Sequence, residues 1–92
     1  TVIEPGAFVL EAAYPNPFNP STSVSLSMPS EGYVSVKAYN LVGQVVGVLA
    51  EGSLSAGLHT MSWDASDLSS GVYLITAEYA GQVSTQKVML MK

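Results

Sequence analysis

Residues 22–28 read Thr-Ser-Val-Ser-Leu-Ser-Met, and their pattern is the clearest indication of the fold class. Val24, Leu26 and Met28 alternate with three serines, so an extended chain has one apolar face and one polar face here. A period of two residues is typical of a β-strand with one buried face. We therefore expect a strand whose apolar side meets a core.

The same alternation recurs along the rest of the chain, between turns rich in glycine and proline. His59, Met61 and Trp63 share one face of a second stretch, and Tyr73 and Ile75 begin the apolar face of a third. We expect strands over residues 8–14, 22–28, 33–39, 45–49, 58–63, 72–79 and 82–91. This series predicts an all-β fold, a seven-stranded antiparallel β-sandwich.

Glycine and proline also predict the turns between these strands. Residues 29–32, Pro-Ser-Glu-Gly, should form a short hairpin turn. Residues 40–43 should form a type I turn closed by a final glycine in the left-handed region. Ala80 resists the positive φ of a type I′ turn, so we expect a type I turn with a bulge at Gly81. Gly47, inside an expected strand, indicates a bulge or a close backbone approach.

The chain has 92 residues, three lysines, no arginine and no cysteine, and its formal net charge is −4. This describes one small domain with a single core and no disulfide or thiolate metal site. Three lysines can neutralise only a few phosphates, and we therefore do not expect nucleic acid as a partner. No apolar run approaches the ~20 residues that span a bilayer, so no transmembrane segment is expected. We expect the chain to be a segment of a longer protein.

Nucleophilic catalysis needs a base beside the nucleophile, and His59 is the only histidine. Because it shares a face with Met61 and Trp63, we expect a buried, neutral histidine with one backbone or hydroxyl partner, rather than a catalytic or ligating one. Asp64 and Asp67 are the only closely spaced acids. They could bind Ca²⁺, but we expect hydrogen-bonded turns with their own backbone instead. The sequence thus predicts no catalytic residue, no cofactor and no metal.

Two tyrosines offer an alternative, a carbohydrate-binding surface. Tyr33 and Tyr39 fall on the polar face of their strand, six residues apart. Sugars stack on exposed aromatic rings, but a separation of about 20 Å is wide for one short oligosaccharide. Half-exposed tyrosines are also common on strands that bind nothing.

Residues 14–22, Tyr-Pro-Asn-Pro-Phe-Asn-Pro-Ser-Thr, form the most distinctive segment. Pro15, Pro17 and Pro20 fix their own φ and keep the preceding residues out of the helical region. We expect a rigid, extended corner. The segment resembles the opening motif of the C-terminal sorting domains of the type IX (Por) secretion system, the type A family of Bacteroidetes and related bacteria.

The resemblance continues through further blocks in the family's order and spacing. These are the central hairpin at residues 32–46, the next element at 56–59 and 63–64, the Ser-Gly-Val-Tyr strand start at 70–73 and the terminal strand at 87–92. The sequence departs from the family pattern at Ala12-Ala13 and at Ala65. The Ig-like domain of the flagellar hook-capping protein shares much of the pattern, so the resemblance implies an Ig-like form of the sandwich.

The resemblance implies a non-catalytic signal for secretion and cell-surface sorting, not an enzyme. Residues 1–13 would be a linker and first strand from an upstream cargo domain, and residues 14–92 the sorting domain. The type IX translocon would recognise it in the periplasm, and a sortase-like peptidase would remove it. The cargo, expected to be a secreted enzyme, would reach the cell surface or the medium.

Two alternatives to a sorting signal stay open. One is a retained module that attaches a secreted enzyme to the cell surface or binds carbohydrate. The other is a self-associating domain of the hook-cap kind.

The resemblance also implies roles for individual residues. A terminal strand is a sensible recognition element, because a sheet edge exposes unpaired backbone groups. The expected translocon contacts on it are Lys87, Val88, Leu90 and Lys92. The residues expected to have structural roles are Tyr14, Pro15, Asn16 and Pro17, which would anchor the first strand to the core, and Gly43, Gly71 and Tyr73, which would fix backbone geometry and a strand start.

Overall fold

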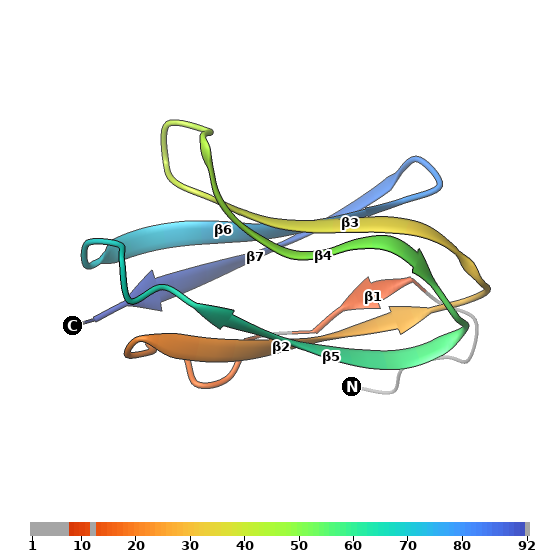
Figure 1. Ribbon diagram of the computed structural model, residues 1–92, viewed down its shortest axis with the longest axis horizontal. Coiled ribbons are helices and arrows are strands. Elements are labelled where there is room, and N and C mark those ends of the chain that lie inside the picture. Colours follow the sequence, from red (N-terminus) through yellow and green to blue (C-terminus); the bar gives the residue numbers. More distant parts are fainter. Residues whose placement is uncertain (1–7, 12, 92) are drawn as a thin grey trace.

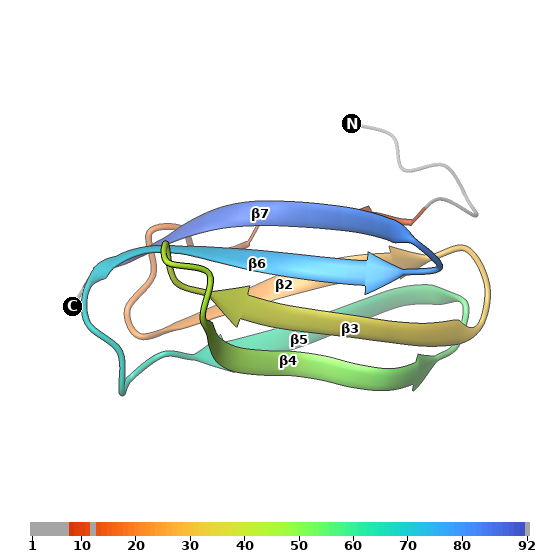
Figure 2. The ribbon, with the colours of Figure 1, turned by 90° about the horizontal axis from the view of Figure 1, so that it is seen from above.

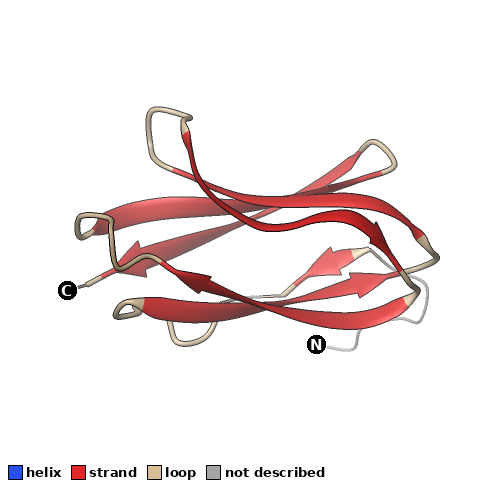
Figure 3. Ribbon diagram, in the orientation of Figure 1, coloured by secondary structure: helices blue, strands red, loops and turns tan. Residues whose placement is uncertain are grey.

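The computed structural model describes residues 8–11 and 13–91 of the chain. These residues form seven strands and no helix (Figures 1 and 3). The strands are β1 (Val9–Leu10), β2 (Ser21–Met28), β3 (Gly32–Tyr39), β4 (Val45–Leu54), β5 (Gly57–Asp64), β6 (Gly71–Tyr79) and β7 (Gln82–Leu90). Neighbouring strands pair antiparallel throughout, which confirms the predicted seven-stranded antiparallel β-sandwich.

The strands lie in two facing sheets. One has the strand order β1–β2–β5, and the other has the order β4–β3–β6–β7. Figure 2 looks onto the four-stranded sheet, in which β7 and β4 are the outer strands. β2 and β3 belong to different sheets, so residues 29–31 cross from one sheet to the other. The predicted hairpin at this connection is therefore wrong.

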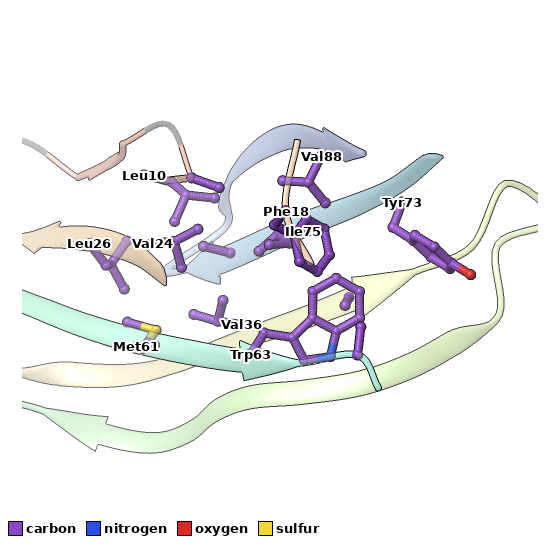
Figure 4. Packing of buried hydrophobic residues seen from close by; sticks show 14 of the residues in the cluster. Leu10, Phe18, Val24, Leu26, Val36, Met61, Trp63, Tyr73, Ile75 and Val88 are labelled. Carbon is purple, nitrogen blue, oxygen red and sulfur yellow. The ribbon is translucent and has the colours of Figure 1, made fainter. Parts of the chain in front are cut away.

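The core lies between the sheets and follows the alternation of the sequence. On β2, Val24, Leu26 and Met28 are buried, while the serines between them are partly exposed. The buried residues of β3 and β6 repeat this pattern: Val34, Val36, Ala38, Tyr73, Ile75 and Ala77. Figure 4 shows apolar side chains from both sheets meeting in this layer. Burial of this apolar surface is the main term that favours folding.

Aromatic rings fill one part of the core. The Trp63 ring centroid lies 5.5 Å from that of Phe18 and 5.7 Å from that of Tyr73. Both distances are typical of favourable aromatic pairs. Gly47 lies against the indole, since a Cβ added to Gly47 would be 2.6 Å from Trp63 Nε1. The predicted close backbone approach at Gly47 is confirmed.

Two strands differ in length from their prediction. β1 has 2 residues where seven were expected, and β4 continues to Leu54 instead of ending at residue 49. The register of β3 with β4 shifts between Val36 and Lys37 and again between Ala38 and Tyr39. The two shifts leave Val46 and Leu49 out of the pairing and interrupt the period of two in the first half of β4. The second half, residues 50–54, pairs regularly with β3, but Glu51, Gly52 and Ser53 give it no apolar run in the sequence.

The two hairpin turns of the four-stranded sheet use positive φ angles. Gly43 has a φ of 88°, as predicted for the end of its turn, and Asn40 Oδ1 accepts hydrogen bonds from two backbone N–H groups of that turn. In the β6–β7 turn, Ala80 has a φ of 50° and Gly81 a φ of 81°. Positive φ at both central residues defines a type I′ turn, so the predicted type I turn with a bulge is wrong. A type I′ turn matches the twist of the flanking strands, and this outweighs alanine's preference for negative φ.

Candidate functional site

β7 combines a buried face with an accessible one at the edge of a sheet (Figure 2). Val88 and Leu90 are each 1% exposed, whereas Lys87 and Met89 lie on the outer face. A partner of the folded domain can therefore reach the Lys87 side chain and the backbone of β7, but not the side chains of Val88 and Leu90. Lys92, the fourth expected contact, lies outside the described residues.

The β6–β7 turn determines which backbone groups of β7 face the edge. Tyr79 and Gln82 are paired across a two-residue loop and form the first hydrogen-bonded pair. Hydrogen-bonded and non-hydrogen-bonded pairs alternate from there. The odd-numbered residues from 83 to 89 thus belong to non-hydrogen-bonded pairs with β6. Their N–H and C=O groups point away from β6, toward the open side of the sheet edge.

Part of this edge is covered by residues 16–18, which we call the strap. Asn16 bridges two edge groups with its side-chain amide. Its Nδ2 donates to the Lys87 carbonyl at 3.1 Å, and its Oδ1 accepts from the Met89 N–H at 3.0 Å. A primary amide can do this because it carries a donor and an acceptor side by side, as a strand backbone does.

Phe18 continues the pairing with its backbone, parallel to β7. Its N–H donates to the Met89 carbonyl, and its carbonyl accepts from the Met91 N–H, both at 2.9 Å. Pro17, between the two pairing residues, has no N–H to satisfy. The Phe18 side chain is 2% exposed and fixes the strap to the core. The strap therefore acts as a short extra strand along the end of β7.

The chain just before the strap is tied to β2. Tyr14 and Ser23 exchange two backbone hydrogen bonds, of 2.9 and 3.0 Å, and Thr22 Oγ1 donates to the Pro15 carbonyl at 2.8 Å. The Tyr14 side chain is 82% exposed. The proline motif is thus attached by hydrogen bonds, and the ring that enters the core belongs to Phe18, which was not among the residues expected to anchor it.

A pocket of about 230 Å³ lies where the strap meets β7. It is lined by Asn16, Pro17, Val72, Lys87, Val88 and Met89. Most of these residues are apolar, and Lys87 is the only charged residue in the lining. The pocket therefore suits an apolar group that lies close to a negative charge.

The two lysines of the described residues differ in their partners. Lys37 Nζ lies 3.6 Å from Glu51 Oε2. Within residues 8–11 and 13–91, Lys87 forms no ion pair. Its ammonium group is therefore available to an acidic group of a partner, beside the uncovered part of the edge.

The profile of the family described as secretion system C-terminal sorting domain matches residues 12–91. The chain belongs to this family. No individual curated protein matches it. Sorting domains of this family are non-catalytic C-terminal signals for type IX secretion, so the domain directs an attached cargo toward the cell surface or the medium. This membership does not favour the alternative of a retained carbohydrate-binding module.

His59 and Asp64 lie on β5, in the other sheet from β7. His59 is only partly buried, which makes the predicted burial wrong, and its Nε2 lies 2.7 Å from the Ser55 carbonyl. It lies near the start of β5, beside the exposed residues Gly57 and Leu58. Its predicted backbone partner is therefore present, but the burial is not. Asp64 Oδ1 accepts from the Ser66 N–H at 2.9 Å, which confirms the predicted turn. Across the described part of the chain, no group of three or more potential metal ligands occurs.

Two further findings concern the surface of the described residues. Tyr33 is 62% exposed, whereas Tyr39 is half-buried, so the two rings are not equally available as a sugar platform. No helix in the described parts of the chain is long and apolar enough to cross a membrane.

Gly71 and Tyr73 lie together at the start of β6. Gly71 has a φ of 157°, which L-residues rarely adopt. The Tyr73 hydroxyl donates to the Ser69 carbonyl at 2.7 Å, while its ring meets Trp63 edge-on. Tyr73 thereby holds the β5–β6 connection against the core.

Proposed function

We propose that the type IX machinery reads this sorting domain as a folded surface and contacts it at β7. Lys87, Val88, Leu90 and Lys92 remain the proposed recognition residues, in two roles. The lysines contact the partner, while Val88 and Leu90 hold β7 on the core so that Lys87 is presented. β7 has a buried face and an accessible face, and the accessible face carries a lysine that forms no ion pair with the described residues; this division supports the proposal.

The proposal extends to the steps around recognition. The domain folds in the periplasm, the translocon engages it, and a sortase-like peptidase separates it from an upstream cargo, which we expect to be a secreted enzyme. Residues 1–13 serve as linker and first strand, and residues 14–92 form the signal. The family match from residue 12 onward supports this boundary. Tyr14, Pro15, Asn16 and Pro17, with Gly43, Gly71 and Tyr73, keep the signal folded.

An export assay tests the proposal. Residues 1–92 are fused behind a periplasm-directed fluorescent cargo in a bacterium with a type IX system, and the signal at the surface and in the medium is divided by the periplasmic signal. The wild-type fusion should leave the cell. Lys87→Glu should lower the exported fraction about tenfold, because it places a like charge opposite the acidic group of the partner.

Lys37→Glu is the matched control, since it makes the same charge change at the other described lysine. It replaces the ion pair with Glu51 by two like charges at a partly exposed site, which costs the folded domain little, so export should stay within about twofold of wild type. Periplasmic retention of a folded wild-type fusion would contradict the sorting function. Equal export of Lys87→Glu and wild type would contradict the role of Lys87 alone.

A further inference from the structure

The uncovered part of the β7 edge is a short, regular template for a strand. The strap takes the Lys87 carbonyl and the backbone groups of Met89. Among the described residues, nothing pairs with the outward N–H and C=O groups of Val83 and Thr85 or with the outward N–H of Lys87. This open stretch spans about five residues, or roughly 16 Å of strand. It begins at the β6–β7 turn and ends at the strap.

The other outer strands of the sandwich are less suited to receive a strand. β4 carries the two register shifts against β3, and bulges of this kind twist an edge away from further pairing. β1 has only 2 residues. β5 is regular, but neither described lysine lies on it and it contributes nothing to the pocket lining. Among the residues that the structure describes, β7 is the outer strand that combines a regular open stretch, a lysine without an ion pair and a place in the lining of the pocket.

The charges along the open stretch differ from one end to the other. Lys87 lies at the strap end, and Glu78, which is exposed, is paired with Val83 at the turn end. An incoming strand thus meets a positive charge near the strap and a negative charge near the turn. An acidic side chain on that strand is favoured only beside Lys87.

The strap also limits how far an incoming strand can pair. Its Asn16 amide already occupies the edge groups beyond Lys87, so the added chain must leave the sheet there. The pocket lies at this point, with Val72, Met89 and Pro17 in its lining. An apolar side chain of the departing chain fits the pocket, next to the acidic residue that faces Lys87.

We infer that residues 83–87 of β7 bind an extended strand of the secretion machinery by β-strand addition, with an acidic side chain on Lys87 and an apolar side chain in the pocket beside the strap. Main-chain hydrogen bonds supply the affinity in this mode of recognition, and the alternate side chains supply the specificity. This inference rests on the proposed function, and it names the kind of partner that β7 takes.

Proline at Thr85 tests the main-chain pairing. The Thr85 N–H points to the edge and takes no part in the ladder with β6, so Thr85→Pro removes an edge donor and obstructs an added strand while the ladder remains. Thr85→Ala changes the side chain but keeps the N–H. In the export assay, Thr85→Pro should lower the exported fraction about tenfold or more, and Thr85→Ala should stay within about twofold of wild type.

The outcomes separate this inference from the sorting function. Efficient export of a folded Thr85→Pro fusion would overturn strand addition and leave the sorting function intact. Retention of the wild-type fusion would remove both. If thermal unfolding shows that Thr85→Pro does not fold, Val83→Pro, compared with Val83→Ala, makes the same test at the next outward N–H.

A second copy of the chain is a rival occupant of this edge. Sedimentation of residues 1–92 should show a monomer. A dimer that Thr85→Pro dissociates would assign the edge to self-association and overturn the inference.

Discussion

The two halves of the β7 edge belong to one strand and face the same way, yet they differ in their partners. The half from Lys87 onward is paired by the strap, through the Asn16 amide and the Phe18 backbone. In the half from Val83 to Lys87, the outward N–H groups meet nothing among the described residues. The difference lies in a segment about seventy residues away in the sequence, since Asn16 and Lys87 are separated by 71 positions.

This difference shows how a sheet edge can be both protected and usable. Free edges invite uncontrolled pairing, and proteins usually shorten or cover them. Here the strap covers one end of β7 and leaves a stretch too short for extensive aggregation but long enough for a specific strand. The covered half fixes β7 to the strap, and the open half leaves backbone groups of β7 accessible to a partner.

Removing the anchor of the strap should have the largest effect on this arrangement. Phe18 is 2% exposed and packs against Trp63, so Phe18→Ala should lower the free energy of unfolding by about 3–5 kcal/mol. Urea denaturation measures this loss. Tyr14→Ala is the control, because the Tyr14 side chain is 82% exposed and should contribute less than about 0.5 kcal/mol. A similar loss for both variants would mean that the core does not anchor the strap.

Opening the covered half should have a smaller effect. Asn16→Ala removes two hydrogen bonds to β7 at an exposed site and should cost about 1–2 kcal/mol. Amide hydrogen exchange adds a local measurement. In the wild type, the Met89 N–H should exchange at least about tenfold more slowly than the Thr85 N–H, and Asn16→Ala should reduce this difference.

Asn19→Ala is the control for this experiment, since Asn19 is exposed and makes no side-chain hydrogen bond within the described residues. It should leave the exchange of the Met89 N–H unchanged. If Met89 is already as unprotected as Thr85 in the wild type, the two halves of the edge do not differ in solution.

The buried and exposed faces of the strands could be predicted from the sequence because the alternation of apolar and polar residues is a local feature. Val24, Leu26 and Met28 alternate with serines whatever strand lies beside them, and all three are buried. Alternation does not identify the neighbouring strand. The turn at residues 29–32 therefore looked like a hairpin, although β2 and β3 lie in different sheets.

The site could be predicted only in part, for a related reason. The alternation of Lys87 with Val88 already separates an outer from an inner face of β7. The strap has no local signal, because its hydrogen bonds join residues 71 and 73 positions apart. The prolines of the motif indicated a rigid corner, but not which strand that corner would meet. The one local hint is Asn16 itself, which lies between two prolines. Its side-chain amide carries a donor and an acceptor, as a strand backbone does.

The smallest predicted effect concerns the turn that begins the open half of β7. Ala80 has a φ of 50°, and the left-handed region costs an L-residue about 1–2 kcal/mol, less for asparagine. Ala80→Asn should therefore raise the free energy of unfolding by about 0.5–1 kcal/mol, measured by urea denaturation.

Gly81→Ala is the control of opposite sign. Because Gly81 has a φ of 81°, an added Cβ should lower the free energy of unfolding by about 1 kcal/mol. The type I turn expected from the sequence predicts no gain for Ala80→Asn, so this variant distinguishes the two turns directly. It also tests whether the two halves of β7 are held independently. Since Ala80→Asn relieves strain at the turn without touching the strap, it should stabilise the domain equally in the wild type and in Asn16→Ala. Unequal gains would show that the turn and the strap hold β7 as one unit.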